Sequence, residues 1–299
     1  MRLMRAANGD IGAWFNTPYE ILDSLPQEAS EQMLREIRRS PRWHGLPYED
    51  PVEKFYDFLN GGDDESVVRY KTSQCRIAKK PKAKSEYRKA FSDGGTEFHI
   101  GKYINGESFM SRRKQVPSKG KMRSKNVTVA VCIAENCGVD ADEIRLRCTT
   151  AMTAVKELQR GGYNVRLICY WTAVDLFKGW NNEKFVMAFP AKDFSDPLVP
   201  PLVLPFCSAY FFRAIVSALS DTAFLPKYDW SLIGLNKAPT VSHCVGRSCD
   251  LSVVSNEIRK ALHIDDDSAI IFDRGECLCE STAKDKLRSL GFEPISSKN

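Results

Sequence analysis

The clearest pattern of apolar positions lies in the middle of the chain and predicts a strand, a helix and a second strand. Residues 126–134 (NVTVAVCIA) are nearly all β-branched or apolar, which is typical of a strand covered on both faces in a parallel sheet. Asp140 and Glu143 predict a capping box at the start of a helix that a glycine pair ends. Residues 163–171 are predicted to return as a strand, and a crossover of this length predicts a parallel, right-handed unit.

The flanking segments predict shorter elements. Residues 1–62 form a helical N-terminal region, in which Ser24 is expected to cap one helix and Asp50 another. After the central unit, strands are predicted at 183–189 and 269–272, and helices at 202–219, 255–262 and 282–290. This alternation indicates an α/β fold with a mainly parallel sheet flanked by helices in residues 126–299.

Charge separates residues 63–125 from the rest of the chain. The net charge is +5, yet residues 69–125 hold 17 Lys or Arg and only four acids, a local net of +13. Prolines and glycines interrupt both basic clusters, which predicts loops or flexible arms rather than amphipathic helices. The expected nucleic-acid-binding residues are Lys79, Lys80, Lys82, Lys84, Arg88, Lys89, Arg112, Arg113, Lys114, Lys119, Lys121, Arg123 and Lys125.

Three interpretations of this basic segment stay open. Clustered Lys and Arg neutralise phosphates and release counterions, which predicts sequence-independent and salt-sensitive binding to DNA or RNA. Tyr70, Tyr87, Phe91 and Tyr103 lie among the charges and can stack on exposed bases. The alternatives are an interface with an acidic protein, as in an assembly module, and a solvated loop region without a ligand.

The ten cysteines favour a reducing compartment, because the chain starts without the hydrophobic core of a signal peptide. Its apolar runs fall short of the ~20 residues that a membrane span needs, so no membrane partner is expected. A late group provides thiols and an imidazole that suit zinc, although the spacing is looser than in common zinc ribbons and unligated thiols are the alternative. The group comprises His243, Cys244, Cys249, Cys277 and Cys279.

Nothing in the sequence points to a specific catalytic site. The four histidines are scattered, and no Walker loop, nucleophile elbow or zinc-protease motif occurs. His263 precedes the acidic run 265–267, but consecutive aspartates are typical of a solvated turn. We therefore expect a non-enzymatic binding protein without a cofactor.

Three stretches resemble a family of uncharacterised phage-encoded proteins built on a von Willebrand factor A-like domain. The first is the helix YEDPVEKFYDFLNGG, and the second is IGKYINGESFMSRRK, which is similar to a G-R-Y-L-x-G-x-P-x-x-M segment of that family. The third is the central strand-helix-strand unit, with its G-V-x-A-D helix start. The resemblance implies a von Willebrand A-like sheet and a phage protein located in the host cytoplasm or the virion.

The corner after the first central strand departs from the metal-binding members of the von Willebrand A class. Those members carry D-x-S-x-S there, whereas this chain reads Ala134-Glu-Asn-Cys-Gly138. Glu135 and Asn136 offer oxygens, but Mg²⁺ requires several oxygen ligands in near-octahedral array. The sequence thus favours an ordinary loop at this corner.

Overall fold

The computed structural model describes residues 1–69, 75–77, 85–92, 97–98, 100–108, 110–117, 126–176, 179, 182–219, 229–236, 248–265 and 269–294. The chain divides into two compact units. Unit 1 combines residues 1–78 with residues 126–299, and unit 2 comprises residues 79–125. In the sequence, unit 2 is therefore an insertion between two parts of unit 1.

Unit 1 is built on a six-stranded mixed sheet with the order β1-β2-β9-β8-β7-β10. The strands are β1 (Arg2–Arg5), β2 (Ile11–Trp14), β7 (Asn126–Cys132), β8 (Asn164–Val174), β9 (Lys184–Lys192) and β10 (Ala269–Phe272). Strands β7, β8 and β10 run parallel to one another, and β2 runs parallel to β9. The β1–β2 and β8–β9 pairs are antiparallel. The predicted α/β class is confirmed, with a sheet that is more mixed than expected.

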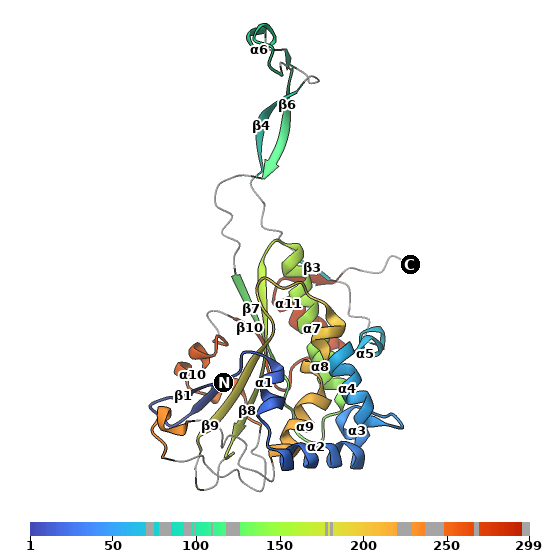
Figure 1. Ribbon diagram of the computed structural model, residues 1–299, viewed down its shortest axis with the longest axis vertical. Helices are drawn as coiled ribbons and strands as arrows, with labels where there is room; N and C mark the ends of the chain where they lie inside the picture. Colours follow the sequence, from blue (N-terminus) through green and yellow to red (C-terminus); the bar gives the residue numbers. More distant parts are fainter. Residues whose placement is uncertain are drawn as a thin grey trace. The chain divides into compact units, whose positions relative to one another are not determined.

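Helices cover both sides of this sheet. Figure 1 shows α7, α8 and α9 on one side and α10 on the other. The helices of unit 1 are α1 (Pro18–Ser24), α2 (Gln27–Arg39), α3 (Pro41–His44), α4 (Pro51–Gly61), α5 (Asp64–Arg69), α7 (Ala141–Arg160), α8 (Pro200–Cys207), α9 (Ala209–Leu219), α10 (Asn256–Ala261) and α11 (Glu280–Ser289), with the 3-10 helices η1 (Trp230–Ile233) and η2 (Leu251–Val253). Across the described ranges, no helix combines the length and the apolar character needed to span a bilayer.

The central β7-α7-β8 unit forms as predicted. The Asp140 and Glu143 side chains make the capping box, and Gly162 adopts a φ of 86° after the helix ends. Strand β7 is almost entirely buried from Thr128 onward, because helices and loops cover both faces of the sheet there. The continuous apolar run identified in the sequence is therefore the centre of the core.

The N-terminal region differs from its helical prediction. Its first residues form β1 and β2, and β2 extends the sheet beside β9. Ser24 does not cap a helix but is the last residue of α1, whereas α2 begins after Pro26. The prediction for α4 is confirmed, since the Asp50 carboxylate accepts the Glu53 N–H at 3.0 Å.

The long apolar stretch after β9 forms two helices instead of one. Helix α8 ends at Cys207, and α9 starts at Ala209 after Ser208 takes an extended conformation. Pro205 lacks a backbone N–H and interrupts the hydrogen bonding of α8 itself, whereas the break at Ser208 lies three residues later. The predicted strands β9 and β10 and the helices α10 and α11 are confirmed.

Unit 2 contains regular structure where the sequence predicted loops or flexible arms. Strand β4 (Ser85–Ser92) pairs along its whole length with β6 (Met110–Pro117) in an antiparallel ladder. A two-residue strand, β5 (Glu97–Phe98), pairs with the start of β6, and the short helix α6 (Ile100–Ile104) follows it. The loop prediction was therefore wrong for these residues. Strand β3 (Cys75–Ile77), which precedes unit 2, pairs instead with β11 (Phe292–Pro294) in unit 1.

Candidate nucleic-acid interface

The paired strands β4 and β6, which we call the basic ribbon, carry like charges opposite each other. The register places Arg88 opposite Lys114 and Lys89 opposite Arg113. Opposite charges on such pairs stabilise a sheet, whereas like charges directly opposite destabilise it. The backbone register thus sets two basic positions of β4 opposite two basic positions of β6.

Unit 2 as a whole also carries a large positive net charge. Residues 79–125 contain fourteen Lys or Arg but four acids, a net of +10, so the rest of the chain carries −5. Each strand of the basic ribbon has eight residues and extends about 26 Å at ~3.3 Å per residue. That length matches about eight nucleotides at a rise of ~3.4 Å.

The predicted binding residues fall into two groups. Five lie in the basic ribbon, where the ladder brings β4 and β6 together: Arg88, Lys89, Arg112, Arg113 and Lys114. The other eight lie outside the described residues: Lys79, Lys80, Lys82, Lys84, Lys119, Lys121, Arg123 and Lys125.

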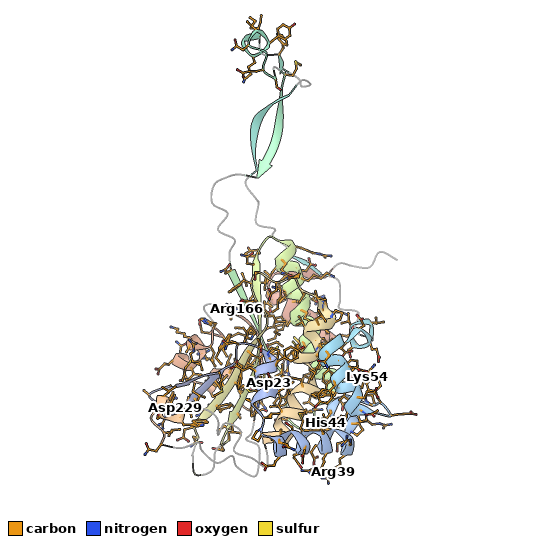
Figure 2. The ribbon with its side chains drawn as sticks, in the orientation of Figure 1. Asp23, Arg39, His44, Lys54, Arg166 and Asp229 are labelled. Atoms are coloured by element: carbon orange, nitrogen blue, oxygen red, sulfur yellow. The ribbon has the colours of Figure 1, made fainter. Side chains whose placement is uncertain are left out.

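Several basic side chains of unit 1 have acidic partners close by. Arg166, labelled in Figure 2, donates from Nε to Asp193 Oδ1 at 2.9 Å and lies over the Phe194 ring. Arg274 donates to Asp250 Oδ1 at 2.9 Å. Lys54 and Glu65 form an ion pair at 2.5 Å. The positive charges of Arg166, Arg274 and Lys54 are thus locally balanced.

An exposed aromatic pair lies beside the basic ribbon. Phe98 is 54% exposed and Tyr103 is 58% exposed, and their ring centroids are 5.6 Å apart at an interplanar angle of 49°. Phe98 occupies β5 opposite Met110 of β6. Tyr103 was predicted from the sequence to stack on bases and Phe98 was not, although an aromatic residue five positions before Tyr103 in a basic segment was a usable signal.

The carboxyl ends of the parallel strands are where many α/β proteins bind ligands, at the point where the strand order reverses. In this sheet that point lies beyond β7 and β10, because α7 leads from β7 to β8 and β10 pairs with the other edge of β7. Glu135 follows β7 and accepts hydrogen bonds from Arg147 Nη1 and from the Gly275 N–H. Asp273 follows β10 and accepts from the Tyr170 hydroxyl at 2.8 Å and from the Leu251 N–H at 3.0 Å.

The polar side chains at the carboxyl ends of β7 and β10 form hydrogen bonds with other groups of unit 1. Arg147 is fully buried and also donates to the carbonyl oxygens of Ala134 and Asp273. Burial raises the pKa of Tyr170 well above its ordinary value, so its hydroxyl keeps the proton that it donates to Asp273. Asn136 Oδ1 accepts from Arg274 at 3.2 Å. The two oxygens that the sequence offered for Mg²⁺ are thus engaged with arginines, as an ordinary structural corner requires.

The zinc candidates do not converge where the structure describes them. Cys277 is buried at a φ of 56°, whereas Cys279 is exposed immediately before α11. His243 and Cys244 lie outside the described residues. Among those that are described, no three His, Cys, Asp or Glu side chains are grouped to hold a metal ion.

Of the residues considered for catalysis, His263 and the acidic run 265–267, the structure describes His263 and Asp265. His263 packs edge-on against Trp14, with ring centroids 5.9 Å apart, and burial lowers its pKa. Asp265 is buried, and its carbonyl accepts the Ala269 N–H at the start of β10. Asp266 and Asp267 lie outside the described residues. His263 therefore packs against an aromatic ring, and Asp265 makes a backbone hydrogen bond at the start of a strand.

A model of the family described as a domain of unknown function, DUF7192, matches residues 14–291. The chain belongs to the DUF7192 family. The match extends from the end of β2 to the turn after α11 and includes all of unit 2. Comparison with curated proteins found no match, and comparison with solved structures found none either. The DUF7192 match therefore covers the basic ribbon as well as strands β7, β8, β9 and β10 of the sheet.

Proposed function

We propose that this DUF7192 chain is a non-enzymatic phage protein that binds nucleic acid through the basic ribbon, largely independently of sequence. The register of β4 and β6 carries the proposal, because it places Arg88 opposite Lys114 and Lys89 opposite Arg113. Phosphates attract Lys and Arg, so bound phosphates would offset the repulsion expected of like charges at paired positions. Phage origin and a von Willebrand A-like sheet rest on the resemblance of the central unit and its flanking motifs.

The basic ribbon suits a phosphate backbone better than a specific base sequence. Contacts from Lys and Arg to phosphates position a protein without reading bases, and they make affinity strongly dependent on salt. A two-stranded ribbon of this kind also fits the width of a nucleic-acid groove. The paired basic positions of β4 and β6 give the ribbon several candidate phosphate contacts along its length.

The test compares two variants that remove the same charge from different places. The first replaces Arg88, Arg113 and Lys114 with Gln and so relieves both like-charge pairs. The matched control replaces Arg39, Arg160 and Arg288, exposed residues of unit 1, with Gln. Fluorescence anisotropy with labelled DNA and RNA, using nuclease-treated full-length protein at several salt concentrations, gives the affinity and its salt dependence.

The ribbon variant is expected to bind more weakly and to lower the slope of log affinity against log salt. On duplex DNA the slope should fall by roughly 0.9 for each phosphate that the ribbon no longer neutralises, or ~2.7 for three phosphates. The control should keep the wild-type slope. Equal weakening of both variants would reveal an effect of net charge alone. Absence of binding at low salt, with self-association of the pure protein, would instead support the alternative of a protein-assembly module.

A further inference from the structure

The end of the basic ribbon carries an unusual concentration of exposed apolar side chains. Phe98, Ile100, Tyr103 and Ile104 are all more than half exposed within seven residues of chain. Figure 2 shows the side chains of α6 and its flanks spreading outward around the short helix. We propose that Phe98 and Tyr103 form a stacking surface for the bases of single-stranded nucleic acid. This inference rests on the proposed function, because the basic ribbon supplies the phosphate contacts.

The position of the pair suits contact with the same strand that the ribbon binds. Phe98 lies opposite Met110, and Arg112 follows two residues later on β6. Two residues of a strand extend about 7 Å, which is close to the rise of two nucleotides. A bound strand can therefore place its phosphates along β6 while one of its bases reaches the aromatic pair.

The geometry of the rings determines how a base would bind. Their centroids are 5.6 Å apart, in the range of direct aromatic contact. A base inserted between two parallel rings needs about 7 Å, twice a stacking distance of ~3.4 Å, so these rings do not form a clamp. More than half of each side chain is nevertheless accessible to solvent. A base is therefore expected to stack on the solvent-accessible part of a ring and not between the two rings.

Single strands suit this surface better than duplexes. Bases of a duplex are already stacked on each other, so a protein ring must separate a base step before it can stack. Bases of a single strand are free of this cost, and stacking on them tolerates any sequence because every base has a π-face. Charge complementarity with the basic ribbon favours a polyanion as the occupant.

The experiment separates stacking from phosphate binding by removing the bases from the ligand. Anisotropy is measured with a 12-nucleotide oligo(dT) and with an abasic strand of the same length and charge. Wild-type protein should bind oligo(dT) about 5- to 150-fold more tightly for each stacked base. The double variant Phe98→Ala/Tyr103→Ala should lose that preference, while its affinity for the abasic strand stays unchanged.

Two controls distinguish an effect of the aromatic rings from an effect of exposed apolar area in general. The exchange Phe98→Tyr/Tyr103→Phe keeps both rings and should preserve the preference for bases. Ile104→Ala removes exposed apolar area that is not aromatic, and it should also preserve the preference for bases. If wild-type protein binds both strands equally with a steep salt dependence, the inference is overturned and the proposed function stands. If neither strand binds at low salt, both are overturned.

Discussion

The ion pair between Glu135 and Arg147 gives the sharpest test of how the carboxyl edge of the sheet is held together. Both side chains are buried, and Glu135 Oε1 also accepts the Gly275 N–H at 2.6 Å. Replacing Glu135 with Ala leaves the Arg147 charge buried among carbonyl oxygens and leaves the Gly275 N–H without this acceptor. Breaking one side of a buried ion pair costs about 3–5 kcal/mol.

This cost is a large part of the ~5–15 kcal/mol that stabilises a typical protein. For a chain of 299 residues, with an unfolding entropy of ~2.1 cal/mol/K per residue, it corresponds to a decrease in Tm of roughly 5–8 °C. The free energy of unfolding is measured by urea denaturation of the wild type, Glu135→Ala and Glu280→Ala. Glu280 is the matched control, because it pairs with Lys284 on the exposed surface of α11 and should contribute less than about 1 kcal/mol.

A second variant separates the ion pair from simple packing. Replacing both partners with apolar residues, Glu135→Leu/Arg147→Met, removes the buried charges together and should recover much of the stability that Glu135→Ala removes. The reasoning is refuted if Glu135→Ala and Glu280→Ala destabilise the protein equally. It is also refuted if the double variant is less stable than Glu135→Ala, because the pair would then not be the source of the cost.

Three further predictions concern single positions. In urea denaturation, Gly45→Ala should destabilise the protein more than Gly234→Ala. Both glycines have positive φ, but only at Gly45 would the new Cβ lie 2.8 Å from Ala141 Cβ. Equal losses of stability in the two variants would contradict this prediction. Hydrogen bonds from Ser281 and Thr282 lower the pKa of Cys279 to about 7, so alkylation of this thiol should rise with pH through about 7; peptide mapping should show a Ser281→Ala/Thr282→Val variant reacting only at higher pH. Burial lowers the pKa of His44, so the unfolded chain takes up a proton that the folded chain excludes as the pH falls below ~6.5. Stability should therefore fall from pH 7.5 to 5.5, and an equally large fall in His44→Gln would show that His44 is not a cause.

Local signals in the sequence were sufficient where neighbouring residues determine the structure. The capping box at Asp140, the cap at Asp50 and the glycines after α4 and α7 act within a few residues of chain, so α4 and α7 form as predicted. Strand β7 was identifiable because burial on both faces requires a continuous apolar run. The charge contrast of unit 2 was likewise a property of composition alone.

Tertiary structure decided what depends on partners distant in the chain. The short segment Ile11–Trp14 carries little periodicity, and it becomes a strand because β9, more than 170 residues away, provides its hydrogen bonds. The hydrogen bond from Arg147 to Asp273 likewise joins residues 126 positions apart. The same holds for the basic ribbon, where composition predicted the charge but only strand pairing placed Arg88 opposite Lys114. Sequence thus determined the helix caps, the central strands and the charge, whereas the tertiary structure set the pairing, because hydrogen bonds between strands depend on distance in space rather than along the chain.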